Sequence, residues 1–133
     1  MAAHFALKGR RIARGRARGV VLRSEQPISF LGEVNPQTGV IEAEDNPLRG
    51  RSIAGSVFAF PHGRGSTVGS YVIYRLKVNG VAPVALINAL AEPIVATGAI
   101  MAGLPMVDQV VLESLPQGAS VEVDADVGVV TFL

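Results

Sequence analysis

Short apolar runs separated by turn-forming residues characterise the first half of the chain. Residues 20–22 (VVL) and 28–31 (ISFL) are two such runs, with Ser-Glu-Gln-Pro between them. This pattern predicts two strands around a turn, and residues 35–39 (NPQTG) predict a second turn. Residues 52–60 (SIAGSVFAF) predict the next strand, which ends at Pro61 because proline has no N–H to donate to a neighbouring strand.

The middle of the chain shows helical spacing. Val68, Val72 and Leu76 follow one another at intervals of four, so that they lie on one face of a helix. This predicts a helix over residues 67–78, with Ser66 at the N-cap and an Asn-Gly pair as its stop.

A second helix is marked by the residues at its two ends. Pro93 suits the first turn and Gly103 suits the position just past the end, which predicts a helix over residues 93–102. Before it, residues 83–90 (PVALINAL) are apolar on both faces. Such a run predicts a central strand covered on two sides.

The last quarter of the chain returns to a strand pattern. Residues 109–114 predict one strand, and residues 120–133 alternate between two sets of side chains: apolar Val121, Val123, Ala125 and Val127, and acidic Glu122, Asp124 and Asp126. Alternation of this kind indicates a sheet with one face in water. Together the elements predict one domain over residues 1–133 with a mixed α/β, β-rich fold and a layer of two helices.

Composition restricts the chemistry that the chain can perform alone. Its 133 residues are enough to bury a core without disulfides or a structural metal. It contains no cysteine, which excludes a thiolate nucleophile and any iron–sulfur cluster or cysteine-bound zinc held by this chain. A group of that kind has to come from a partner.

The net charge of +1 hides an asymmetry. Residues 1–31 carry seven basic side chains and one acidic one, whereas residues 32–133 carry five and ten. We interpret residues 1–18 as a basic amino-terminal extension of the domain. Without interleaved aromatic residues, it favours a strand whose arginines face solvent or an acidic partner over an arm that binds nucleic acid.

The chain shows no signal for export or membrane insertion. Residues 1–7 lack an apolar core of the signal-peptide type. The longest uncharged runs fall short of the ~20 residues needed to cross a bilayer. We therefore expect a cytoplasmic chain with neither a membrane nor a nucleic acid as partner.

The glycine-rich segment at residues 63–69 (GRGSTVG) is the strongest candidate site. It matches neither standard phosphate-loop pattern. It does place a serine hydroxyl, Ser66, at a predicted helix amino terminus with Arg64 beside it, where unpaired N–H groups favour an anion. The pattern alone leaves open that Ser66 only caps the helix.

Other polar side chains have structural alternatives. His62 lies beside the bend, where it is a candidate ligand contact or a hydrogen-bonded structural residue. The alternating Glu122, Asp124 and Asp126 are a candidate cation site, but their spacing favours the solvated face of a strand. The sequence predicts no metal site in this chain.

Two stretches resemble a known family. Residues 46–76 (NPLRGRSIAGSVFAFPHGRGSTVGSYVIYRL) and 83–108 (PVALINALAEPIVATGAIMAGLPMVD) are similar to the swivelling domain of the aconitase X family, found fused or as a free-standing small subunit. The motif at residues 65–71 (GSTVGSY) is specific in that context. The resemblance implies a three-layer β/β/α swivelling fold like that of aconitases.

The same resemblance implies a site shared between two chains. A cysteine-bearing large subunit would hold the iron–sulfur cluster, which the resemblance implies is of the 4Fe-4S type, and the two chains would form a heterodimer or larger assembly. Ser66 matches the loop serine that removes a proton next to the substrate carboxylate. Arg64, Gly65, Thr67 and His62 would surround a small anionic substrate.

The resemblance further implies a hydro-lyase subunit that is inactive alone. The expected reaction is dehydration of (R)-5-phosphomevalonate to trans-anhydromevalonate 5-phosphate in isoprenoid biosynthesis. The alternatives are a subunit that dehydrates cis-3-hydroxy-L-proline, or an anion-binding module without chemistry. Composition and spacing do not select among these substrates.

Overall fold

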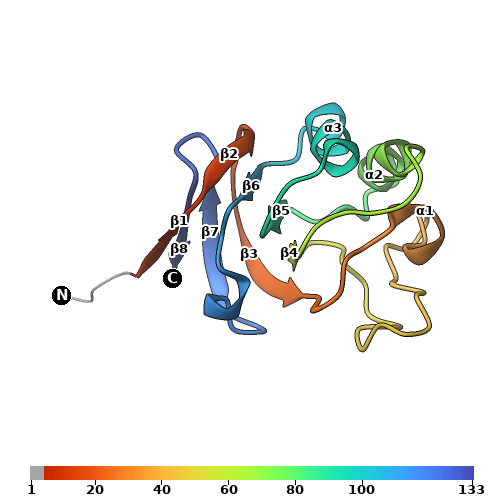
Figure 1. The fold of residues 1–133 in the computed structure, drawn as a ribbon, viewed down its shortest axis with the longest axis horizontal. Helices are drawn as coiled ribbons and strands as arrows, with labels where there is room; N and C mark the ends of the chain where they lie inside the picture. The colour runs from red at the N-terminus through yellow and green to blue at the C-terminus, as the bar shows by residue number, and fades with distance from the viewer. Residues whose placement is uncertain (1–4) are drawn as a thin grey trace.

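The computed structural model describes residues 5–133, in which eight strands and two longer helices are joined by short loops (Figure 1). The strands are β1 (Ala6–Lys8), β2 (Arg10–Ala13), β3 (Arg16–Arg23), β4 (Val57–Phe60), β5 (Ala85–Asn88), β6 (Met106–Asp108), β7 (Ser120–Asp124) and β8 (Val129–Phe132). The helices are α1 (Phe30–Glu33), α2 (Gly69–Val78), α3 (Pro93–Ala102) and the 3-10 turn η1 (Leu112–Ser114).

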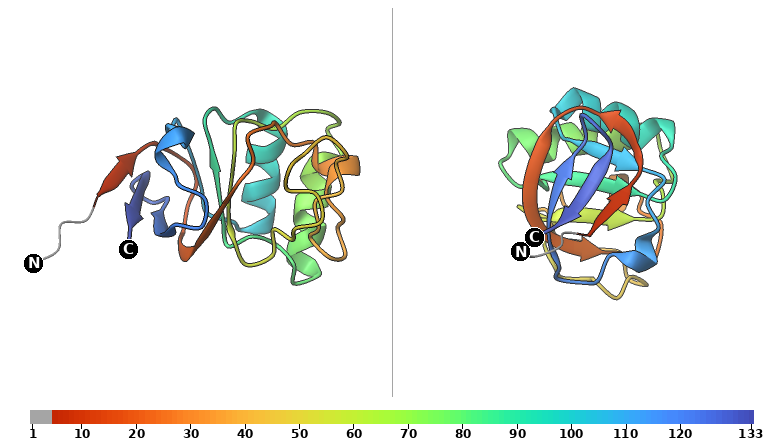
Figure 2. Two further views of the ribbon diagram at one scale, coloured as in Figure 1. Left: turned by 90° about the horizontal axis from the view of Figure 1, so that it is seen from below. Right: turned by 90° about the vertical axis from the view of Figure 1, so that its left-hand side faces the viewer.

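All eight strands belong to one mixed sheet in the order β1-β8-β7-β3-β4-β5-β6-β2. Strands β3 to β6 are parallel, whereas β7, β8, β1 and β2 are each antiparallel to their neighbours. β1 and β2 lie at opposite ends of this order although only Gly9 separates them along the chain. The sheet therefore curls until its two edges meet (Figure 2), where the Gly9 N–H donates to the Gly128 carbonyl at 2.7 Å.

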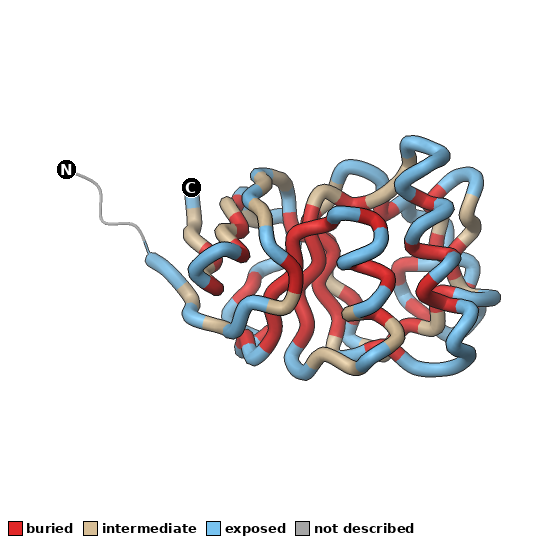
Figure 3. The backbone as a smooth tube through the Cα atoms, turned by 90° about the horizontal axis from the view of Figure 1, so that it is seen from above, coloured by how far each residue is buried: buried red, intermediate tan, exposed pale blue. Residues whose placement is uncertain are grey.

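The curled sheet buries side chains on both of its faces. In β4, Phe58 and Phe60 pack toward the helices, while Val57 and Ala59 pack toward β7 and β8. β5 alternates in the same way and is fully buried, which confirms the predicted central strand. Figure 3 shows this buried band running through the parallel strands and the inner sides of the helices. The layers are those of a β/β/α arrangement.

The two long helices pack on one face of the parallel strands and against each other. α3 has the predicted bounds, because Glu92 accepts hydrogen bonds from the first-turn amides and Gly103 ends the helix at φ +67°. α2 ends as predicted but begins at Gly69, two residues later than expected. Gly98 of α3 lies so close to α2 that a Cβ there would be 2.7 Å from Ile73 Cδ1. The helix pair depends on this close approach.

Two strand predictions in the first half of the chain need correction: one strand is absent, and the other is shorter than predicted. Residues 28–31 form no strand beyond an isolated bridge at Ile28, because Gly32 turns the chain at φ +92° and Glu33 accepts a hydrogen bond from the Ser29 N–H. The predicted strand over residues 52–60 is limited to β4, because Gly55 turns the chain at φ +71°.

The carboxyl-terminal prediction also needs correction. Residues 109–114 are not a strand: β6 ends at Asp108, and Gln109 adopts φ +58° before η1. Residues 120–133 form a hairpin rather than one strand, and the turn leaves Val127 69% exposed. Val121, Val123 and Ala125, by contrast, are buried as the alternation predicts.

Within the described residues, the basic amino-terminal extension forms strands, as predicted, and its Arg10, Arg16 and Arg18 are paired with carboxylates of this chain. Arg16 and Arg18 of β3 contact Glu122 of β7 at 2.7 and 3.2 Å, and Arg16 also contacts Asp124. The hydrogen bond from Arg16 lowers the pKa of the Glu122 carboxyl below its ordinary value. These side chains form the solvated face of the β3–β7 pair.

We expect Gly98→Ala to destabilise the fold by about 1–3 kcal/mol, because the new methyl group would overlap Ile73 in a close-packed interface. The free energy of unfolding from urea titration measures this cost. Thr97→Ala, an exposed change one residue away, serves as the control and should stay within ~0.5 kcal/mol. Equal stability of the two variants would contradict the packing role of Gly98.

Candidate active site

The predicted site residues lie together on the loop that joins β4 to α2. This loop starts where β4 ends, and the loop from β5 to α3 starts at the same edge of the parallel strands. Ligands of α/β sheets commonly bind at this carboxyl edge. A Cβ at Gly63 would overlap the Glu92 carboxylate at the start of α3, so the loop passes directly across that helix amino terminus.

Ser66 is exposed and is not the N-cap of α2. The N-cap is Val68, which makes no side-chain hydrogen bond. The residues before it form tight turns, so the helix begins only at Gly69. Ser66 Oγ accepts a hydrogen bond from the Val68 N–H at 3.1 Å. Its hydroxyl proton has no acceptor among residues 5–133, and the residue is exposed at the surface of the loop.

The backbone around Ser66 offers further donors. The N–H groups of Gly65, Ser66 and Thr67 donate to no acceptor in the described chain. Gly65 has φ +89°, and a Cβ there would overlap the Ser29 hydroxyl, so only glycine fits. Successive free amides around a left-handed residue form a concavity that attracts anions.

Arg64 is held in place by a residue distant in the sequence. Its Nη2 lies 2.6 Å from Glu33 Oε2, and Glu33 Oε1 accepts a hydrogen bond from the Ser29 N–H at 2.7 Å. The Arg64 side chain remains 50% exposed. Glu33 therefore ties the segment around α1 to the loop that carries Ser66, while the outer side of the guanidinium stays open.

His62 has a defined tautomer. Its Nδ1 lies 2.8 Å from the Gly63 carbonyl oxygen, which can only accept, so Nδ1 carries the proton. Nε2 is then free to accept a hydrogen bond at the exposed surface of the loop.

Three residues that support this edge were not predicted from the sequence. Asn88, fully buried at the end of β5, donates to the Phe60 carbonyl at the end of β4, and its Oδ1 has no partner within the described residues. Asp108, fully buried at the end of β6, binds Arg10 through both oxygens and accepts from the Ala91 N–H. Glu33 is the third. Each is isolated among apolar residues in sequence, and only the folded topology shows its partners.

Within residues 5–133, no group of three or more His, Cys, Asp or Glu side chains is placed to hold a metal ion. Glu122 and Asp124 bind arginines instead. The part of the chain that the structure describes also has no helix of the length and apolarity needed to span a bilayer.

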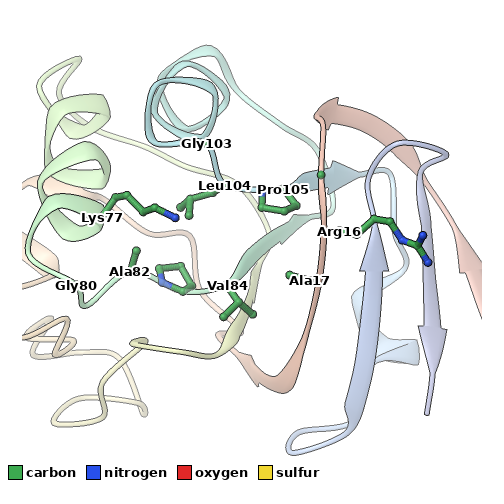
Figure 4. A pocket seen from close by; sticks show the side chains of 11 residues that line it. Arg16, Ala17, Lys77, Gly80, Ala82, Val84, Gly103, Leu104 and Pro105 are labelled. Carbon is green, nitrogen blue, oxygen red and sulfur yellow. The ribbon is translucent and has the colours of Figure 1, made fainter.

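A hollow of about 480 Å³ lies at the opposite, amino edge of the parallel strands (Figure 4). Lys77 points into it, whereas Arg16 turns away toward β7. None of the predicted site residues lines this hollow. The loop with Ser66 is thus an open surface on the other edge of the sheet.

The family model of the aconitase X swivel domain matches residues 6–132, nearly the whole chain. The chain belongs to this family. The swivel-domain fold expected from the resemblance is confirmed, and the match includes β1 and β2 of the basic segment.

Relatives of this aconitase X swivel domain carry a consistent name. A phosphomevalonate dehydratase small subunit of Thermococcus onnurineus (strain NA1) is 56% identical over 93% of this chain and 95% of its own. One of Methanosarcina acetivorans is 53% identical over 96% and 90%. The crystal structure of Thermococcus kodakaraensis aconitase X in its holo form superposes with a TM-score of 0.95 at 54% identity, covering 96% of this chain and 98% of that one.

We expect Glu33→Ala to loosen the loop of this swivel domain without unfolding it, because Glu33 joins Ser29 and Arg64. Hydrogen exchange at the amides of Ile28 and Arg64, which pair the two segments through the His62 and Ile28 carbonyls, should accelerate about tenfold, while the global unfolding midpoint changes little. Glu25→Ala, which removes the exposed partner of Arg23, is the control and should leave exchange at the loop unchanged. Unaltered exchange in Glu33→Ala would show that the ion pair does not order the loop.

Proposed function

We propose that this chain is the small subunit of a two-subunit hydro-lyase that dehydrates (R)-5-phosphomevalonate to trans-anhydromevalonate 5-phosphate in isoprenoid biosynthesis. The observation that carries the proposal is the identity of 51–56% to curated relatives that all bear this name, over more than 90% of this chain. The family-model match over residues 6–132 includes the whole loop with Ser66. An anion-binding module without chemistry has no comparable support.

Ser66 acts as the proton acceptor in this proposal. A serine oxygen is a poor base in water, and it becomes useful when donors point at it in a site from which water is excluded. The Val68 N–H already points at Ser66 Oγ. The positive end of α2, which starts three residues later, favours negative charge at the same place.

The proton balance is simple. Ser66, as the alkoxide, takes the proton from the carbon next to the substrate carboxylate, and the C–H electrons form the new double bond as the C–O bond of the neighbouring carbon breaks. The hydroxide that leaves then takes the proton from the Ser66 hydroxyl, which gives water and restores the alkoxide. When bound, an iron–sulfur cluster of the large subunit, of the 4Fe-4S type in our proposal, would supply the Lewis acid for that hydroxyl group.

The substrate's negative groups are held by the loop. We assign the free amides of Gly65 and Thr67 and the open side of Arg64 to an anionic group of the substrate. We assign His62, whose Nδ1 is bound to the Gly63 carbonyl, to a further substrate contact through Nε2. Because this chain has no cysteine, the large subunit has to provide the cluster ligands and the opposite wall of the site.

The direct test of the proton acceptor is Ser66→Ala in the co-expressed two-subunit complex. We expect assembly and the cluster absorbance to be preserved and kcat to fall by about 10³-fold, within the range for loss of a general base. Ser52→Ala is the matched control, because Ser52 Oγ also accepts from the N–H two residues ahead but lies outside the loop. Retained turnover in Ser66→Ala would remove Ser66 from its role. Turnover of cis-3-hydroxy-L-proline but not of phosphomevalonate would redirect the substrate assignment.

Arg64→Ala tests the anion contact. We expect KM for phosphomevalonate to rise about tenfold, since a charge-assisted hydrogen bond is worth roughly 1.5–3 kcal/mol, whereas kcat changes less. Arg18→Ala removes a similarly exposed arginine ion pair on the other face and should leave both constants unchanged. Steady-state kinetics of the two variant complexes decide the point, and an unchanged KM in Arg64→Ala would count against the assignment.

A further inference from the structure

Helix α3 carries no charged side chain. In its sequence, PIVATGAIMA, Thr97 is the one polar side chain, whereas α2 carries Arg75 and Lys77 in its last turn. The inner side of α3 packs on the sheet and on α2. On its outer side, Ile100 is 63% and Met101 40% exposed. A surface helix normally has a polar outer face, and an exposed apolar face marks a contact surface.

The outer face of α3 connects two distinct places on the molecule. α3 begins beside the loop that carries Ser66, where Glu92 packs against Gly63. It ends at a hollow of about 360 Å³, whose apolar lining includes Ile12, Ile100 and Leu104. The uncharged outer side of α3 lies between the loop with Ser66 and this hollow: Pro93 and Thr97 are exposed in its first part, and Ile100 and Met101 in its last turn.

The hollow carries positive charge that the chain does not neutralise. Arg11 and Arg14 line it, and no Asp or Glu is among the described residues around it. The neighbouring arginines Arg10, Arg16 and Arg18 all contact carboxylates of this chain, but no described carboxylate lies within ion-pair distance of Arg11 or Arg14. The two free guanidinium groups are complementary to an acidic partner.

We propose that the outer face of α3, together with the hollow between Arg11 and Arg14, is a docking surface for the large subunit. The partner would lay an apolar segment along Ile100 and Met101 and place carboxylates at the two arginines. This inference rests on the proposed function, since the partner that completes the site at Ser66 must already cover the start of α3. The same partner then continues along a surface of matching chemistry.

The outer face of α3 is tested in the co-expressed complex by Ile100→Glu. The matched control is Val78→Glu, because Val78 is 67% exposed at the end of the other long helix, α2. Dilution of each complex, followed by mass photometry, gives the dissociation constant between the subunits. We expect Ile100→Glu to raise it at least tenfold and Val78→Glu to change it less than twofold. Equal dissociation constants for the two variants would overturn the docking surface.

The charged part is tested by Arg11→Gln/Arg14→Gln, a double change that keeps the side chains polar and leaves buried residues untouched. Its control is Arg49→Gln/Arg51→Gln, which removes two exposed arginines from another loop. We expect the first pair alone to slow subunit association about fivefold at 50 mM salt, with a smaller effect at 300 mM because salt screens the attraction. Indistinguishable association rates for the two pairs would overturn the charge complementarity.

Turnover separates this inference from the proposed function. With the large subunit at saturation, kcat of the docking variants should equal that of the unmodified complex, because none of the changed residues contacts the substrate. An intact, tightly associated complex that does not dehydrate phosphomevalonate would overturn the proposed function. An active complex that is indifferent to Ile100, Arg11 and Arg14 would overturn only the docking surface.

Discussion

The parallel pairing of β4 with β5 decides where chemistry can occur in this domain. Because both strands end at one edge, the loop with Ser66 and the start of α3 lie side by side. Asn88 joins the two strand ends through the Phe60 carbonyl, and two amides after β5 donate to the Pro61 carbonyl. The backbone around Ser66 is thus anchored at its origin, which keeps its free amides directed outward.

Closure of the sheet accounts for the uneven charge of the chain. β2 adds to one end of the sheet, where Arg10 meets Asp108 of β6, and β3 pairs with β7, where Arg16 and Arg18 meet Glu122. Three arginines of the basic amino-terminal extension are therefore paired within the domain. Arg11 and Arg14, which no described carboxylate pairs, lie beside helix α3.

Local sequence signals predicted the elements whose ends are set by local chemistry. α3 is bounded by a proline and a glycine, and the central strand β5 is apolar throughout. The errors occurred where tertiary contacts decide. Residues 28–31 have strand propensity, but Phe30 packs on Phe58 and Phe60 while Gly32 turns the chain away. α2 begins two residues later than predicted, because the turn hydrogen bonds after Ser66 compete with a side-chain cap.

The sequence predicted the part of the candidate site that lies within one loop, but not the residues that reach it from distant positions. The loop residues are contiguous, so their motif was visible in the sequence, whereas Glu33 reaches Arg64 across 31 positions and only the fold shows the pair.

Ser66 Oγ should meet the substrate at a surface covered by the large subunit. The decisive measurement is a structure of the two-subunit complex with a 3-deoxy analogue of phosphomevalonate bound. We expect Ser66 Oγ to lie within about 3.5 Å of the carbon next to the carboxylate. An Oγ directed to solvent, or another side chain at that carbon, would contradict it.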